Sequence, residues 1–192
     1  MLDDLLTYTH LHSSTYEIEL VQVDGMEFFE MLLSGYEPLC SEKNIDLQTI
    51  CDANGTYAVN PKQMIRVVDN VMSNAIHHTE AGKRIWLAAV TDEKVVKNGL
   101  FDFVFQNAAF EDGYAYLLVQ NEGTGISEEA LQHVFDPLYQ ADQARSKKEA
   151  RGTGLGLSIT KQIIERHGGD VEIFSKENVG TCVICRIPQI LK

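Results

Sequence analysis

Apolar residues at helical spacing predict three helices along the chain. The first is expected from about Gly25 to Cys40, with Asp24 as its N-cap. The second begins near Pro61, since proline is tolerated in a first helical turn. The third runs from Leu155 to His167 and ends at Gly168-Gly169, a typical glycine C-cap. The second helix also carries a polar stripe on the face opposite its apolar residues.

Alternating apolar and polar residues predict short strands between and after these helices. Their expected ranges are 45–50, 57–59, 84–90, 114–120, 170–175 and 181–187. Few strands alternate regularly with helices, so the order does not predict a purely parallel sheet. We expect one domain over 24–192, preceded in 1–23 by the end of a helix and an extended connection.

The stretch 91–113 separates two predicted strands and contains an apolar segment of its own. It is either an extra hairpin with a partner-binding role or a tolerated insertion, and the second interpretation is favoured.

Charge narrows the range of partners. The 192 residues include 16 Lys and Arg against 28 Asp and Glu, so the formal net charge is −12. This balance argues against nucleic acid or an anionic membrane as the main partner. No apolar run approaches the ~20 residues that a membrane-spanning helix needs. We therefore expect a cytoplasmic domain, attached to a membrane only through upstream segments that this sequence lacks.

The four cysteines are Cys40, Cys51, Cys182 and Cys185, and the last two form a C-x-x-C pair. Their surroundings alternate like a strand, in which residues three apart point to opposite faces. The pattern therefore predicts buried free thiols and no metal or redox site.

Three glycines at alternate positions, Gly152, Gly154 and Gly156, lie just before the third helix. Glycine lets a backbone approach a ligand closely, and the free N–H groups of the following helix attract anions. The basic residues Arg145, Lys147, Lys148 and Arg151 lie beside them in an otherwise acidic chain. A tight turn is the alternative, but the charge favours a phosphate site.

Two asparagines, Asn70 and Asn74, lie four residues apart on the polar stripe of the second helix. Residues at this spacing lie one above the other on the same face. They are either solvated amides or oxygen ligands for Mg²⁺, which proteins commonly share with phosphate groups. A third asparagine, Asn121, ends the strand 114–120 on its core-facing side and precedes Glu122-Gly123-Thr124-Gly125-Ile126. Ser127 is then expected to cap a short helix.

Four sequence motifs occur in the order in which one protein family carries them. They are 66–79 (RVVDNVMSNAIHHT), 121–126 (NEGTGI), 135–145 (FDPLYQADQAR) and 151–159 (RGTGLGLSI). Together they resemble the catalytic and ATP-binding domain of a bacterial two-component sensor histidine kinase, a member of the GHKL ATPase superfamily. The resemblance implies an α/β (α+β) two-layer sandwich in which a mixed sheet packs on three helices, the Bergerat-type ATP-binding fold.

The resemblance also implies the roles of individual residues. Asn74 would bind Mg²⁺ and, with Asn70, form the catalytic pair; Asn121 would contact adenine. Gly123 and Gly125 would line the adenine pocket. The full set of implied nucleotide-binding positions is Asn74, His77, His78, Asn121, Gly123, Gly125, Ile126, Arg145, Lys147, Lys148, Gly152, Thr153, Gly154, Leu155, Gly156, Leu157 and Thr181.

The sequence departs from the family pattern at two positions. The residue that contacts the exocyclic amine of adenine is usually aspartate, and here it is Asn121. An amide oxygen still accepts that hydrogen bond but without charge assistance, so weaker adenine binding is expected. Gln140 replaces a common arginine, which leaves phosphate contacts to Arg145, Lys147 or Lys148, and His77.

The implied activity is transfer of the ATP γ-phosphoryl group to a histidine on an upstream dimerisation helix, for relay to a response regulator. In this family the acceptor is a histidine followed directly by an acidic residue, and none of the six histidines here is followed by one. The acceptor is therefore expected outside this sequence, in a homodimeric kinase, and 1–23 would be the end of its dimerisation helix and a linker. Asn70 cannot act as the base found in ATP-hydrolysing relatives. Alternatives are a nucleotide-binding domain with little or no catalysis, a protein-serine kinase of the same fold and, least favoured, a DNA-topology or mismatch-repair ATPase.

Overall fold

The computed structural model describes residues 2–12, 18–140 and 153–190. The helices are α1 (Leu2–His12), α2 (Gly25–Leu33), α3 (Glu37–Glu42), α4 (Pro61–His77), the 3-10 helix η1 (Glu93–Val95), α5 (Asp102–Asn107), α6 (Glu128–Leu131) and α7 (Gly156–Arg166). The strands are β1 (Val21–Asp24), β2 (Asp46–Asp52), β3 (Thr56–Val59), β4 (Arg84–Val90), β5 (Tyr114–Glu122), β6 (Asp170–Lys176) and β7 (Gly180–Pro188).

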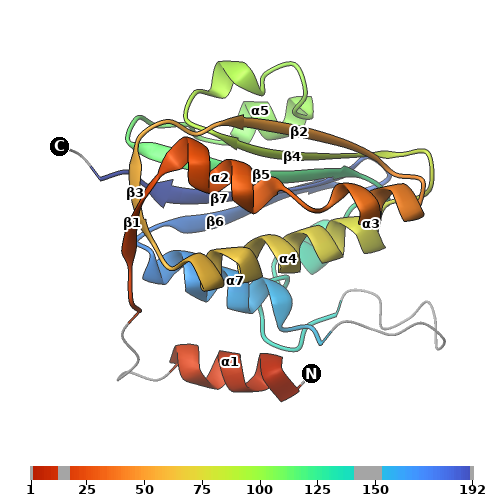
Figure 1. The fold of residues 1–192 in the computed structure, drawn as a ribbon. Coiled ribbons are helices and arrows are strands. Elements are labelled where there is room, and N and C mark those ends of the chain that lie inside the picture. The colour runs from red at the N-terminus through yellow and green to blue at the C-terminus, as the bar shows by residue number, and fades with distance from the viewer. Residues whose placement is uncertain (1, 13–17, 141–152, 191–192) are drawn as a thin grey trace.

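Five strands form one mixed sheet in the order β2-β4-β5-β7-β6. β2 and β4 are parallel, and the other neighbouring pairs are antiparallel. β1 and β3 form a separate antiparallel pair. Helices α2, α4 and α7 lie along one face of the five-stranded sheet (Figure 1). The predicted sandwich of a mixed sheet on three helices is therefore confirmed.

The main core fills the space between this face and the helices. β5 contributes Ala115, Leu117 and Val119, and α4 and α7 contribute fully buried residues such as Val67 and Ile159. The side chains of Asp24 and Asn60 cap the N-termini of α2 and α4. Asp24 accepts from the backbone N–H of Glu27, and Asn60 accepts from that of Gln63.

The predicted single helix over 25–40 is wrong, because two helices occupy that range. The helical hydrogen bonds of α2 end at Ser34, whose ψ of 155° is extended, and Gly35 follows with a φ of +94°. Pro38 then lies in the first turn of α3, where its ring and missing N–H are tolerated. The apolar periodicity continued across this break and concealed it.

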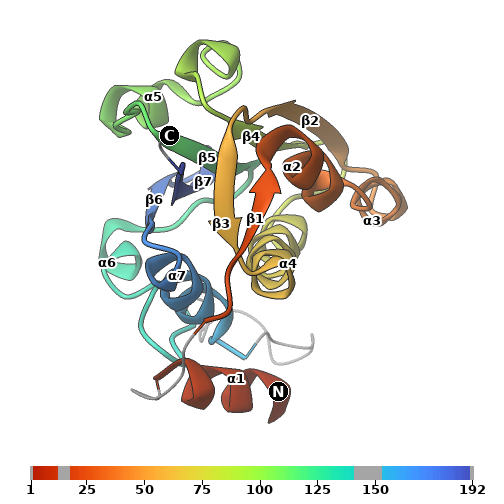
Figure 2. The ribbon, with the colours of Figure 1, turned by 60° about the vertical axis from the view of Figure 1, so that its left-hand side comes forward.

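The stretch 91–113 covers the opposite face of the sheet. It forms η1 and α5 rather than a hairpin, so the hairpin alternative is wrong. Val96, Leu100 and Val104 form a second buried core with the outward-facing side chains of the strands, including Leu118 and Ile184. Figure 2 shows α5 on the side of the sheet away from α4 and α7.

The two cysteines of the C-x-x-C pair face opposite sides of β7. Cys182 belongs to the second core and Cys185 to the main core. Burial raises the pKa of the Cys185 thiol to about 12, and also raises that of Cys182, so both stay protonated. The prediction of buried free thiols is confirmed for this pair.

Helix α1 packs beside α7 and below α4 (Figure 1). The guanidinium of Arg66 contacts the Asp4 carboxylate at 2.7 Å, and Arg166 donates to the backbone carbonyl of Leu11. In the described part of the chain no helix is long and apolar enough to cross a membrane.

Candidate functional site

The polar stripe of α4 faces the start of α7. The Asn70 side-chain nitrogen donates to the Gly156 carbonyl oxygen at 3.1 Å and lies 3.5 Å from the Thr160 hydroxyl oxygen. This amide therefore fastens α4 to the helix that follows the glycine-rich motif. One turn further along, Asn74 is exposed to solvent, and so is His77.

The C-terminal end of α4 meets the loop after β5. A Cβ on Gly123 would lie 2.4 Å from the carbonyl oxygen of His78 and 3.0 Å from the Asn121 side-chain nitrogen. Only glycine permits this approach, because no real Cβ comes so close to a backbone oxygen. Gly123 thereby brings Asn121 next to the end of the helix that carries Asn74 and His77.

Asn121 lies near the end of β5, the central strand, on the face of the sheet that packs against the helices. β5 places it between Ile85 of β4 and Thr181 of β7, and only 6% of its surface is exposed. Its side-chain nitrogen lies 3.4 Å from the Glu122 carbonyl oxygen. The strand alternation predicted this direction correctly, since Ala115, Leu117 and Val119 share the same face.

A hydroxyl network joins the first glycine motif to the hairpin of β6 and β7. The backbone N–H of Ile126 donates to the Ser175 hydroxyl oxygen at 2.8 Å. That hydroxyl is 2.9 Å from the Gly180 carbonyl oxygen, which can only accept, and 2.7 Å from the Thr181 hydroxyl. Ser175 was missed from the sequence, because its role depends on a partner 49 positions away.

Further backbone bonds hold the same loop against the β6–β7 turn. Asn178 donates to the Thr124 carbonyl at 2.7 Å, and Gly123 donates to the Val179 carbonyl at 3.2 Å. Gly125 has a φ of +68°, and a Cβ there would lie 2.2 Å from the Lys176 carbonyl oxygen. The two glycines of this motif are thus required by the packing of the protein itself.

The second glycine motif contacts the end of the segment after α6. Gly154 has a φ of +69°, and a Cβ there would lie 2.8 Å from the Leu138 carbonyl carbon. The Gly154 carbonyl also accepts from the backbone N–H of Leu138 at 2.9 Å. Leu138 and Gly154, which flank the part of the chain outside the described residues, are therefore joined. Phe135 is held from α7, where the Lys161 ammonium lies 5.3 Å from its ring centroid.

Not every predicted residue can take part through its side chain. Leu155 is 2% exposed and packs in the main core, so only its backbone could contact a ligand. Its N–H lies 3.3 Å from the Thr153 hydroxyl oxygen. Leu157 is half-buried in the first turn of α7. The predicted residues Arg145, Lys147, Lys148 and Gly152 lie outside the described residues.

The residues present fit a Mg²⁺ ion that is shared with phosphate. Asn74 offers an exposed amide oxygen, a donor that Mg²⁺ accepts, while Asn70 uses its nitrogen on Gly156. Within the described ranges, no group of three or more His, Cys, Asp or Glu could hold a metal by itself. Phosphate oxygens and water would have to supply the remaining ligands.

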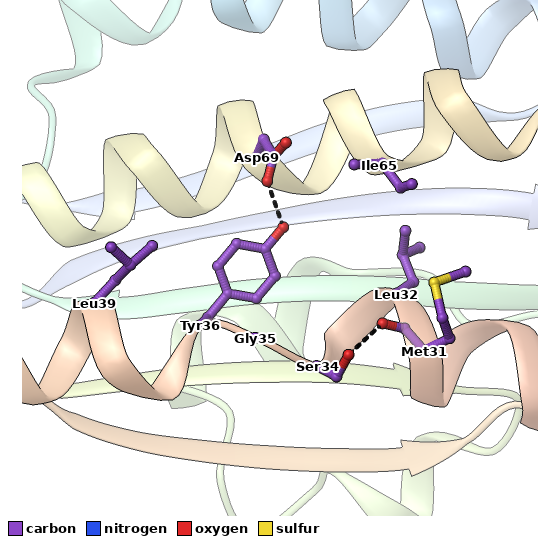
Figure 3. A pocket seen from close by; sticks show the side chains of 8 residues that line it. All are labelled: Met31, Leu32, Ser34, Gly35, Tyr36, Leu39, Ile65 and Asp69. Carbon is purple, nitrogen blue, oxygen red and sulfur yellow. Dashed lines mark hydrogen bonds between the residues drawn. The ribbon is translucent and has the colours of Figure 1, made fainter.

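A separate cavity of about 300 Å³ lies between α2, α3 and α4. Met31, Leu39 and Ile65 line it, and the Tyr36 hydroxyl donates to Asp69 across it at 2.7 Å (Figure 3). None of the predicted site residues lines this cavity, so it is distinct from the candidate nucleotide site.

Comparison with known proteins finds a family match over the part of the chain that holds the candidate site. The family model described as histidine kinase-, DNA gyrase B- and HSP90-like ATPase matches residues 59–190. The sensor histidine kinase WalK of Bacillus subtilis is 26% identical over 189 residues, which are 98% of this chain and 28% of that protein. The sensor protein SrrB of Staphylococcus aureus is 35% identical over 127 residues, 66% of this chain and 18% of SrrB.

Solved structures share the fold. Full-length ShkA in complex with AMPPNP has a TM-score of 0.73 at 21% identity, over 97% of this chain and 35% of ShkA. The catalytic domain of the histidine kinase ThkA has a TM-score of 0.66 at 24% identity, over 90% of this chain and 99% of that domain. The chain thus spans less than a third of WalK and nearly all of an isolated catalytic domain.

Proposed function

The chain belongs to the family of histidine kinase-, DNA gyrase B- and HSP90-like ATPases, and from this we propose that it is the catalytic domain of a sensor histidine kinase. It binds Mg²⁺-ATP and transfers the γ-phosphoryl group to a histidine of an upstream dimerisation helix. The observation that carries the proposal is the approach of Gly123 to the His78 carbonyl, which places Asn121 beside the end of α4. A base-binding strand and a helix with an exposed amide ligand then meet at one site.

Different residues bind different parts of the nucleotide. Asn121 accepts from the exocyclic amine of adenine through its amide oxygen, with Thr181 beside it on β7. The N-terminal N–H groups of α7 face the phosphates, where their partial positive charge favours an anion. Asn74 would hold Mg²⁺, which would neutralise phosphate charge. Phosphoryl transfer depends mainly on such positioning and neutralisation.

Asn70 has a positioning role in this scheme. Its side-chain nitrogen donates to the Gly156 carbonyl, so it sets the start of α7 relative to Asn74. An amide does not accept a proton near neutral pH and so cannot activate water as a general base. This favours group transfer over rapid ATP hydrolysis.

The partners follow from the same proposal. The phosphoryl group passes from the dimerisation helix, in a homodimer, to a response regulator. The domain works in the cytoplasm, and any membrane attachment lies in upstream segments. Helix α1 marks the entry from those segments, because it packs on α7 ahead of the domain.

The test is calorimetric titration of Mg²⁺-ATP into this domain and into Asn74→Ala. The wild type is expected to bind with a Kd of roughly micromolar to millimolar, and Asn74→Ala to bind at least about tenfold more weakly, a loss of ~1.4 kcal/mol. Ser73→Ala is the matched control, because Ser73 is also exposed on α4. Absence of binding at millimolar ATP, or equal binding by all three proteins, would contradict the proposal.

A nucleotide-binding domain with little catalysis is the second candidate, and Asn121 in place of aspartate favours it. Transfer of labelled γ-phosphate separates the two candidates, with the domain joined to its upstream histidine helix. Nucleotide binding without labelling of the helix would support the second candidate over the first.

A further inference from the structure

Near the end of β5, two consecutive side chains point to opposite faces of the sheet and differ in their roles. Asn121 points to the helix side, toward the proposed base site, and the preceding residue, Gln120, points to the opposite side. Gln120 follows Tyr116 and Leu118 on the face that the stretch 91–113 covers. It is 5% exposed, one of few buried polar side chains in the described residues.

Both polar atoms of the Gln120 amide are bonded to the covering segment. Its oxygen accepts from the backbone N–H of Phe101 at 2.8 Å, and its nitrogen donates to the Gly99 carbonyl at 2.8 Å. A side chain with one acceptor and one donor bound to two fixed backbone groups cannot shift without losing both bonds. The covering segment is therefore fixed to β5 directly behind Asn121.

The same segment contacts β7 behind the partner of Asn121. A Cβ on Gly180 would lie 2.9 Å from the ring of Phe101, so this ring rests on the backbone next to Thr181. In register, Asn121 pairs with Thr181 and Glu122 pairs with Gly180. One short segment thus supports both strands at the point where they present the proposed base-binding side chains.

We propose that Gln120 is a positioning residue for nucleotide binding, which sets the place of Asn121 and Thr181 by tying the residues 99–101 to the reverse face of the sheet. The inference rests on the proposed function, since it assumes that Asn121 contacts the base. Gln120 does not touch the nucleotide and acts only through β5. The stretch 91–113 then helps to hold the nucleotide site in place. It affects binding of the base more than binding of the phosphates.

The test compares nucleotide selectivity with stability. Gln120→Met removes both hydrogen bonds and keeps the length of the side chain. The matched control is Val104→Ala, which removes buried volume from the same second core and leaves the Gln120 bonds intact. Each protein is titrated with Mg²⁺-ATP and with the Mg²⁺ complex of purine riboside triphosphate, which lacks only the exocyclic amine. Thermal unfolding is measured in parallel.

The wild type should prefer ATP, because only ATP offers the amine to Asn121. In Gln120→Met we expect ATP affinity to fall about fivefold or more and the preference for ATP to fall toward one, whatever the change in Tm. Val104→Ala should lower the Tm and keep the wild-type preference. A second variant, Phe101→Leu, removes the ring from Gly180 and should reduce the preference in the same direction if Gln120→Met does not fold.

Two results overturn the inference alone. The first is an unchanged preference for ATP in Gln120→Met, or in Phe101→Leu if Gln120→Met does not fold. The second is an equal loss of this preference in Val104→Ala, which would indicate a purely structural role. A wild-type domain that binds neither triphosphate overturns the proposed function and this inference with it. These outcomes are distinguishable, because the wild-type titration reports on the site and the variants report on its support.

Discussion

Gly154 and Gly156 belong to one motif, but the protein needs them for different reasons. At Gly154 the backbone has a positive φ, and a Cβ would press against the backbone of Leu138. At Gly156 the nearest atom of the described residues to an added Cβ is 3.7 Å away, an ordinary contact distance. Nothing among the described residues therefore requires glycine at residue 156, and the proposed function gives it a role in a close approach of phosphate.

This difference predicts opposite behaviour of two alanine variants. Gly156→Ala should keep or raise the free energy of unfolding, by up to about 1 kcal/mol, since alanine favours a helix, and should weaken binding of Mg²⁺-ATP. Gly154→Ala should lower the free energy of unfolding, because both the φ and the space oppose it. Denaturant unfolding and calorimetry check the two quantities separately. Wild-type ATP affinity in Gly156→Ala would count against a phosphate contact at this position.

At the scale of elements, a buried histidine joins the end of α7 to the start of α4. His167 is 4% exposed, and its Nδ1 donates to the Ile163 carbonyl at 2.7 Å. Its Nε2 accepts from the backbone N–H of Asn60, the N-cap of α4, at 2.9 Å. This pair of bonds requires the neutral imidazole. Burial lowers the pKa of His167, which agrees with the neutral form.

The lowered pKa predicts how stability depends on pH. The unfolded histidine has a pKa of about 6.5, so below that pH the unfolded state binds more protons than the folded state. The contribution of His167 is therefore fully present above about pH 6.5 and is lost as the pH falls toward the folded pKa, by at most ~1.4 kcal/mol per pH unit.

Urea unfolding between pH 5 and 8 measures this dependence. His167→Gln is the comparison, because glutamine can make both hydrogen bonds without titrating in this range. Its unfolding free energy should vary less below pH 6.5 than that of the wild type. The same pH slope in both proteins would show that the dependence does not come from His167.

The element scale also shows where periodicity misleads. Apolar spacing runs on through Gly35, so a single helix was expected where α2 and α3 occur. A break that preserves the apolar face does not change the spacing of the apolar residues. Only Gly35 and Pro38 indicate the break in the sequence. By contrast, the start of α4 and both ends of β4 and α7 were predicted to within about one residue. Pro61 marks the start of α4, Gly168-Gly169 marks the end of α7, and the alternation of apolar residues marks β4.

At the scale of the whole molecule, the sheet is covered on both faces. The helix face holds the main core, and the stretch 91–113 covers Tyr116, Leu118 and Ile184 on the other face. Without that cover these large apolar side chains would form an exposed patch, which promotes aggregation.

Replacing residues 93–110 by a short flexible linker should therefore reduce solubility and increase binding of an apolar dye. The same deletion with Leu118→Thr and Ile184→Thr is the control, and it should recover part of the solubility, since threonine suits an exposed strand face. Light scattering and dye fluorescence provide the measurement. A deletion that remains monomeric and binds no dye would show that the cover is not needed for solubility.

The amino-acid sequence by itself determined six of the strands, the helices α4 and α7, the family with the mixed sheet on three helices that it implies, and the facing of Asn121, Cys182 and Cys185. These depend on local spacing, on end signals and on motifs of contiguous residues. Only the tertiary structure decided the break after α2, the form of 91–113 and the contacts of Ser175, Gln120 and His167. Each of these depends on a partner distant in the chain, and a single buried polar residue carries no sign of which partner it will meet.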